Sequence, residues 1–190
     1  MSNPYYVKQN FEKIDFTENE FAQGEYENCI FSICNFSDSD LSNIRFIDCE
    51  FNGCNLSMSK MTKTIFNNVK FKECKILGVN FENCNEFLFS CDFADCILNF
   101  SSFFKRNLKS TKFKNCSLQE VDFTESDLSN ITFDNCNLAM AKFENTILEK
   151  ADLRTSFNFS IDPEKNRIKK AKFSLDGISG LLDKYDIVIQ

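Results

Sequence analysis

The chain contains ten cysteines, and a cysteine can bind a metal, form a disulfide or act as a nucleophile. Neighbouring cysteines are at least five residues apart, so there is no Cys-x-x-Cys pair, and the chain has no histidine. The absence of histidine excludes Ser-His and Cys-His nucleophile pairs. Six cysteines instead follow one another at intervals of 20, 20, 22, 20 and 20 residues: Cys34, Cys54, Cys74, Cys96, Cys116 and Cys136. A period of twenty is typical of a solenoid.

A finer period of five residues runs through the same region. Each unit has a large apolar residue at its centre, a small or β-branched residue two positions earlier, and polar residues elsewhere. Thirty centres follow the pattern, from Tyr6 to Phe81 and then, after a step of seven residues, from Leu88 to Leu153, and none is polar. Such self-similarity indicates one supersecondary unit stacked on itself.

The cysteines are assigned to the small inward position, where Ala, Ser, Thr and Val stand in neighbouring units. A buried free cysteine packs as a small hydrophobic residue. We therefore expect the ten thiols to be core side chains rather than metal ligands or disulfides. No metal and no cofactor is expected, because the predicted core is too narrow to hold one.

A period of five with a Phe or Leu centre and a small residue two before it resembles the pentapeptide repeat proteins, over residues 4–153. The resemblance implies an all-β solenoid, a right-handed quadrilateral β-helix in which four pentapeptides form one square coil. Independently, the centres sort by twenty into four columns. One column reads Phe11, Phe31, Phe51, Phe71, Phe93, Phe113, Phe133 and Leu153. Thirty units make about 7–8 coils, which at about 4.8 Å each give a rod roughly 36 Å long.

Two regions are predicted, residues 1–160 as the β-helix and residues 161–190 as the last coil with a capping and dimerisation tail. The segment 171–173 lies twenty residues beyond 151–153 and is expected to close the last coil. Ser174 is expected to cap a short helix from Leu175 to about Lys184, before a strand-like end over 186–189.

An apolar stripe on the predicted helix could cover the end of the rod and pair two rods across a two-fold axis. The stretch 161–182 also resembles the tail of the quinolone-resistance pentapeptide repeat proteins, in which the tail makes the dimer. The expected dimer-interface residues are Leu175, Ile178, Leu181, Leu182, Tyr185 and Ile187.

The repeat is broken near residues 82–90, where two extra residues are inserted. Close by, Phe89, Phe100 and Phe104 stand at positions that should face outward, and Arg106 stands at an inward one. We expect this corner to bulge, with Arg106 turned out toward Glu86 beside an exposed aromatic patch. Such a patch marks either a partner site or a packing defect. The candidate patch consists of Glu86, Phe87, Phe89, Phe104 and Arg106.

The formal net charge is −6, and residues 161–190 carry one more basic than acidic residue, so the predicted rod has −7. An acidic rod repels nucleic acid and could attract a basic, DNA-handling surface. Resemblance to the quinolone-resistance proteins implies a dimer that occupies the DNA-binding saddle of DNA gyrase or topoisomerase IV. About 36 Å of duplex carries roughly 21 phosphate charges, so mimicry would need the acids gathered on one face.

Two functions remain open. The first is a DNA-mimicking binder of DNA gyrase or topoisomerase IV that modulates the enzyme and quinolone resistance. The second is a structural or adaptor rod for an unrelated protein partner. Many protective family members carry long loops, whereas only two extra residues interrupt these coils, which favours inhibition or simple binding over protection.

The sequence predicts no enzyme, because no catalytic set and no glycine-rich phosphate loop is present. It contains no apolar run of the length that a signal peptide or membrane span needs. We expect a cytoplasmic protein that binds a protein partner and makes no direct contact with nucleic acid or membrane.

Overall fold

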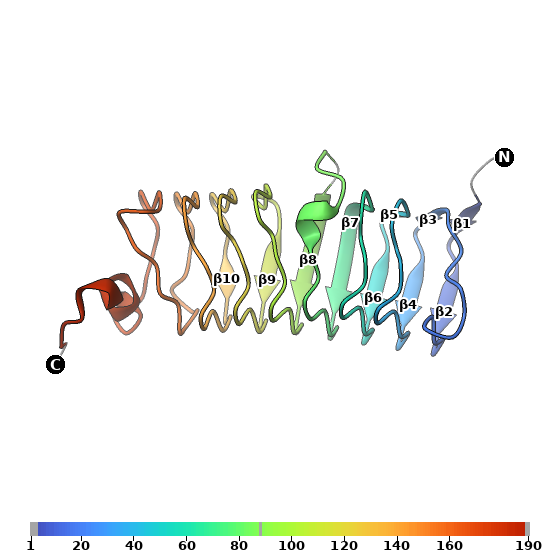
Figure 1. The fold of residues 1–190 in the computed structure, drawn as a ribbon, viewed down its shortest axis with the longest axis horizontal. Coiled ribbons are helices and arrows are strands. Elements are labelled where there is room, and N and C mark those ends of the chain that lie inside the picture. The colour runs from blue at the N-terminus through green and yellow to red at the C-terminus, as the bar shows by residue number, and fades with distance from the viewer. Residues whose placement is uncertain (1–3, 88, 189–190) are drawn as a thin grey trace.

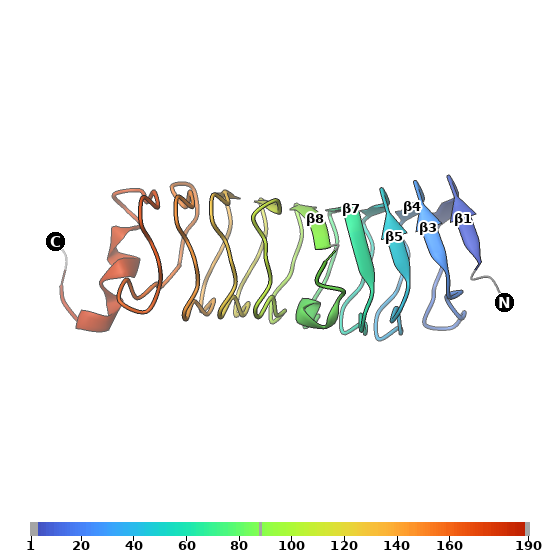
Figure 2. The same ribbon diagram turned by 90° about the horizontal axis from the view of Figure 1, so that it is seen from above.

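The computed structural model describes residues 4–87 and 89–188. The chain folds as an all-β parallel solenoid, whose coils are stacked along one long axis with the two termini at opposite ends (Figures 1 and 2). Neighbouring coils pair in parallel, with Tyr6 opposite Tyr26 and Phe31 opposite Phe51. The spacing of twenty residues between partners confirms that four pentapeptides form one coil.

Strands form on two adjacent faces of the square coil. One face contains β1 (Tyr5–Val7), β3 (Glu25–Glu27), β5 (Arg45–Ile47) and the start of β7 (Ile65–Lys72). The next face contains β2 (Asn10–Glu12), β4 (Ile30–Ser32), β6 (Glu50–Asn52), the end of β7, then β8 (Phe89–Ala94), β9 (Lys112–Lys114) and β10 (Phe133–Asp134). The other two faces are joined by isolated bridges such as Asn35 with Asn55 and Asp122 with Lys142.

Each coil turns its corner two residues after a centre, where the backbone φ is positive. Lys13, Asn28 and Asp48 occupy such corners with φ of 55°, 54° and 51°, and Gly53 and Gly78 have φ of 62°. Asparagine, aspartate and glycine tolerate this conformation better than other residues. The polar residues of the repeat therefore lie where the chain must bend.

The centres form the core, and their rings stack from coil to coil. The ring centroids of Phe11 and Phe31 are 4.8 Å apart, and those of Phe103 and Phe123 are 5.6 Å apart. Rings of different columns meet edge to face, as Phe93 and Phe103 do at 6.1 Å and 75°. Both arrangements are favoured by the quadrupole of an aromatic ring. The predicted columns are thus confirmed within the described residues.

The ten cysteines are free and buried, which confirms that they are core side chains. The backbone N–H of Cys34 donates to Cys54 Sγ at 3.4 Å, and the Cys54 thiol donates to the carbonyl oxygen of Phe31 at 3.3 Å. The cysteines that follow one another about every twenty residues, from Cys34 to Cys136, form a sulfur column. This column therefore helps to join one coil to the next. Within residues 4–87 and 89–188, no group of three potential ligands is arranged to hold a metal ion.

The last coil closes as predicted, because Lys172 pairs with Asp152 and Phe173 packs at the edge of the core. The predicted helix from Leu175 to Lys184 is wrong. The tail instead forms two short 3-10 turns, η2 (Ile178–Leu181) and η3 (Asp183–Tyr185). Ser174 does accept a hydrogen bond from the Gly177 N–H, at 3.0 Å.

Contact with the rod, rather than helix propensity, sets the backbone of the tail. A Cβ atom at Gly180 would collide with the carbonyl oxygen of Phe159, so the chain approaches the last coil where it has no side chain. The predicted strand over 186–189 is also wrong for 186–188, because Asp186 adopts the left-handed conformation and the next two residues are irregular. Ile189 lies outside the described residues.

The register break contains η1 (Phe81–Asn83), a single 3-10 turn between β7 and β8. Beyond it the chain rejoins the sheet with Phe89 opposite Phe66, followed by a register shift before Val69 pairs with Cys91. The five-residue count makes Leu88 the first centre after the break, but Leu88 lies outside the described residues, and Phe89 is the residue that pairs with Phe66. None of the helical turns in the described part of the chain has the length and apolarity to cross a bilayer.

Candidate interaction surfaces

The corner at the register break projects from the rod between β7 and β8 (Figure 1). Its backbone is tied to the preceding coil, because the Asn85 N–H donates to the Thr64 carbonyl oxygen at 2.9 Å. The Asn85 side-chain oxygen then accepts the N–H of Phe87 at 3.1 Å. Phe87 itself is 85% exposed. An aromatic side chain therefore stands on a corner whose backbone is fixed by hydrogen bonds.

Arg106 holds this corner from inside the rod and is only 4% exposed. Its guanidinium donates to the carbonyl oxygens of Phe81, at 2.9 Å, of Glu82, at 3.0 Å, and of Cys84. It also lies over the Phe89 ring, 5.2 Å from the centroid. Burial lowers the pKa of Arg106, partly opposed by the nearby acidic side chains and thiols. The charge is tolerated because carbonyl dipoles replace the lost water.

The expectation that Arg106 turns out toward Glu86 is therefore wrong. The 3-10 turn aims three carbonyl groups into the corner, and a buried guanidinium satisfies them better than a solvated one. The Glu82 Oε2 atom nearby is buried and has no hydrogen-bond partner among the described residues. The five-residue repeat assigns Arg106 to an inward position. The three carbonyl groups that accept its hydrogen bonds are brought to it only by the fold of the corner.

The other predicted patch residues do not form one continuous aromatic surface with Phe87. Phe89 is half-buried and meets the Phe81 ring edge to face at 5.8 Å. Phe104 is also half-buried, with the Lys105 ammonium 4.7 Å above its ring. Phe87 and Glu86 are the exposed members of the set. The corner thus presents one aromatic side chain and one carboxylate.

Most of the tail residues that we expect at a dimer interface are exposed to solvent. Leu175 is 88% exposed, and Ile178, Tyr185 and Ile187 are about half exposed. Leu181 is partly buried against the core, and Leu182 is also partly buried. The apolar stripe is therefore divided between the rod and the solvent.

Ion pairs fasten the tail to the last coil. The Lys184 ammonium lies 2.7 Å from the Asp162 carboxylate and 2.8 Å from that of Glu164. These contacts lower the pKa of both carboxyl groups and raise the pKa of Lys184. The Ile161 N–H also donates to the Gly180 carbonyl oxygen at 2.8 Å. The tail therefore depends on both charge and backbone contacts.

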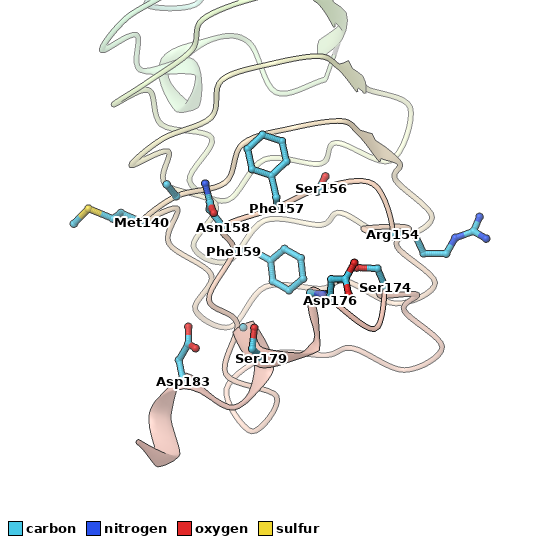
Figure 3. A pocket seen from close by; sticks show the side chains of 13 residues that line it. Met140, Arg154, Ser156, Phe157, Asn158, Phe159, Ser174, Asp176, Ser179 and Asp183 are labelled. Atoms are coloured by element: carbon cyan, nitrogen blue, oxygen red, sulfur yellow. The ribbon is translucent and has the colours of Figure 1, made fainter. Parts of the chain in front are cut away.

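An open hollow of about 700 Å³ lies between the tail and the last coils (Figure 3). The rings of Phe157 and Phe159 and the side chains of Ser174 and Asp176 line it. Arg154, on its rim, is occupied by hydrogen bonds to Asp152. The hollow is open, and its lining is mostly polar.

Acidic and basic residues are interleaved along the rod. Ion pairs join residues of adjacent coils, as between Glu25 and Arg45 at 2.9 Å and between Glu149 and Arg167 at 2.7 Å. Further pairs between coils include Glu50–Lys70, Asp92–Lys112, Lys105–Glu125, Lys109–Asp127, Glu144–Lys165 and Asp152–Lys172. Many carboxylates are thus paired with a lysine or arginine of a neighbouring coil. In the sequence, the only indication of these pairs is that residues of opposite charge stand about twenty positions apart.

The stacked coils form a parallel β-solenoid built on a five-residue repeat. A model of pentapeptide repeats matches residues 29–68, 101–139 and 116–154, with eight copies of the repeat. The chain therefore belongs to the pentapeptide repeat family. Comparison with curated protein sequences gives no significant match.

Solved structures of pentapeptide repeat proteins share the fold. A trypsin-treated variant of QnrB1, a plasmid-mediated fluoroquinolone resistance protein, superposes with a TM-score of 0.61 at 17% identity, over 100% of both chains. Full-length QnrB1 gives 0.54 at 17% identity, over 97% of this chain and 100% of that one. HetL is involved in heterocyst differentiation regulation in the cyanobacterium Nostoc sp. strain PCC 7120. It superposes with a TM-score of 0.57 at 12% identity, over 92% of this chain and 90% of HetL. At these identities the likeness concerns the fold.

Proposed function

We propose that this chain is a non-enzymatic binding rod that presents its projecting corner to a protein partner. The position of Phe87 carries the proposal, because this exposed phenylalanine stands on a backbone that Arg106 holds from within. An aromatic side chain on a fixed backbone buries a large apolar area and loses little conformational entropy on binding.

DNA gyrase or topoisomerase IV is the partner to test first. The family resemblance to quinolone-resistance proteins suggests it, and QnrB1, a fluoroquinolone resistance protein, shares the fold. In this proposal the rod binds the topoisomerase, modulates its activity and alters its response to quinolones. The short corner supports inhibition or simple binding more than protection, because it offers little surface beyond the rod.

An adaptor for an unrelated protein partner is the second candidate. The ion pairs between coils favour it over DNA mimicry, since carboxylates paired with lysine or arginine do not reproduce an unbroken row of phosphates. Binding through the corner would then depend on apolar contact rather than on charge. A cytoplasmic location stays a prediction, supported by free thiols that suit a reducing compartment.

The test is a gyrase supercoiling and binding assay with the wild type and Phe87→Ser, with and without a quinolone, at two salt concentrations. Phe87→Ser should leave the melting temperature unchanged and abolish the effect on gyrase. Phe100→Ser is the matched control, because Phe100 is also an exposed phenylalanine, 56% exposed, but stands at a regular turn of the next coil rather than on the inserted segment. It should behave as the wild type.

The outcomes separate the two candidates. Binding that fades with salt and competes with DNA supports mimicry, whereas salt-resistant binding that needs Phe87 supports apolar docking. If micromolar wild type neither inhibits gyrase nor relieves quinolone inhibition, the topoisomerase proposal fails. Capture of a partner that Phe87→Ser does not retain would then support the adaptor.

We also propose that two rods pair through the tail. Leu175, Ile178 and Ile187 expose apolar surface at one end of the rod, and burial of that surface against a second copy would stabilise a dimer. Analytical ultracentrifugation should show a dimer that Leu175→Glu with Ile187→Glu converts to a monomer. The control pair Met58→Glu with Met140→Glu, also exposed, should remain dimeric. A monomeric wild type at tens of micromolar would refute the pairing.

A further inference from the structure

Four lysines surround a hollow on the face formed by β6 to β9, away from the projecting corner. These strands lie side by side along the rod (Figure 1). Lys70 and Lys72 belong to β7, and Lys112 and Lys114 belong to β9. Their side chains and that of Ala94, on the strand between them, line a hollow of about 370 Å³.

Two columns of outward-facing side chains cross this face, and over β7, β8 and β9 they differ in one residue. In the first, Lys70, Asp92 and Lys112 occupy successive strands, and the Asp92 carboxylate lies 3.5 Å from the Lys112 ammonium. In the second, the register places Ala94 between Lys72 and Lys114. The second column therefore has a methyl group where the first has a carboxylate.

The two lysines that flank Ala94 have little compensation. Lys72 lies 3.4 Å from the exposed carboxylate of its neighbour Glu73, a pair that water screens. Lys114 lies beside Asp134 of β10 in the register, but no ion pair joins their side chains, so the Lys114 ammonium stays free on the side of Ala94. Since neighbouring strands are about 4.8 Å apart, the two lysine backbones are about 10 Å apart. A carboxylate entering between them could reach both ammonium groups.

We propose that the hollow over Ala94 binds a glutamate or aspartate side chain from an extended segment of a partner protein. The incoming carboxylate takes the position between Lys72 and Lys114 that Asp92 takes between Lys70 and Lys112. Glu50 and Asp92 border the hollow, so one carboxylate is accepted while a polyanion such as nucleic acid is repelled. This surface is separate from the Phe87 corner and does not depend on it.

The test uses the full chain labelled with ¹⁵N and the capped peptide acetyl-Val-Thr-Glu-Val-Thr-amide, with the Gln analogue as its uncharged match. Titration of the Glu peptide should shift amide signals of β7, β8 and β9, and the Gln peptide should bind at least fivefold more weakly. Raising the salt concentration should weaken the binding of the Glu peptide, because the contact is ionic. Shifts confined to other strands, or equal binding of both peptides, would overturn the proposal.

Substitution of Ala94 gives a sharper test, because it supplies the proposed ligand from within the chain. Ala94→Asp should weaken peptide binding at least fivefold and raise the melting temperature. Ala94→Asn introduces an uncharged side chain of the same size, and its effects on peptide binding and on the melting temperature should both be smaller. Lys72→Gln with Lys114→Gln should also lose binding, and Lys60→Gln with Lys142→Gln, on another face, should retain it. Stronger binding of a single-stranded oligonucleotide than of the peptide would contradict the choice of a protein segment.

Discussion

At the scale of single residues, Arg106 shows how one buried charge completes an irregular corner. The regular coil places small side chains inward, and the wider corner after β7 leaves room for a guanidinium. Three carbonyl groups turn toward it, and those of Glu82 and Cys84 would lose this donor if the side chain were removed, whereas that of Phe81 would keep the Cys84 N–H. The corner and the arginine are therefore interdependent.

Replacing Arg106 with leucine should lower the free energy of unfolding by about 3 kcal/mol, since buried carbonyl groups would lose their donors. Urea denaturation followed by circular dichroism measures the change. Lys105→Leu, at the exposed neighbouring position, is the matched control and should stay within about 0.5 kcal/mol of the wild type. Equal effects of the two substitutions would show that the corner does not need the guanidinium.

Ile33 occupies a corner with a φ of 57°, a conformation that disfavours β-branched residues. Because its side chain is exposed, Ile33→Asn should stabilise the fold by about 1 kcal/mol through relief of this strain. Thermal and urea unfolding would detect the gain. Ile97→Asn, at an exposed position in an isolated bridge, should bring none. A loss of stability in Ile33→Asn would mean that the isoleucine contributes more by covering Gly53 than it costs.

At the scale of elements, the tail is a short segment whose position depends on ion pairs. Lys184 lowers the pKa of Asp162 and Glu164, so their contribution is present above the ordinary carboxyl pKa of about 4 and is lost as the pH falls through the lowered values. The raised pKa of Lys184 adds stability below about pH 10 that is lost at higher pH. Attachment should therefore be strongest between these limits.

Hydrogen-exchange protection factors for residues 178–185 should fall when the pH drops below about 4, while those of β8 remain high. Lys184→Met should show weak protection of the tail already at pH 7 and little further change on acidification. A tail that stays protected at low pH would indicate that the backbone contact between Ile161 and Gly180 is sufficient by itself.

At the scale of the whole molecule, the solenoid has one continuous core, and the sulfur column follows it from Cys34 to Cys136. Burial raises the pKa of Cys49 to about 12 and raises that of Cys91 well above its ordinary value. Thiolates, rather than thiols, react with electrophiles. Chemical labelling of the cysteines therefore reports on opening of the core.

Native protein at pH 8 should label none of its ten thiols with maleimide on a timescale of minutes, and all ten in 8 M urea at the same pH. Mass spectrometry counts the labels. Rapid labelling of Cys84 alone in the native state would instead show that the corner opens locally. Faster labelling of every thiol in Arg106→Leu would link the corner to the stability of the entire rod.

Much of the fold could be predicted from the sequence because the repeat is local. A residue's inward or outward direction follows from its place in the pentapeptide, and thirty repetitions make the columns of Phe31, Phe51 and Phe71 unambiguous. The same reasoning placed the cysteines in the core and closed the last coil near Phe173. It located the candidate corner as well, since an insertion breaks the count.

Only the tertiary structure decided the direction of Arg106, the backbone of the tail and the interleaving of charge. Each depends on atoms about twenty residues away, namely the carbonyls beneath Arg106, the Phe159 backbone against Gly180 and the lysines on either side of Ala94. A local repeat determines which side chains point inward. Contacts between coils determine which polar groups form hydrogen bonds and ion pairs, because these interactions depend on distance in space and not on position in the pentapeptide.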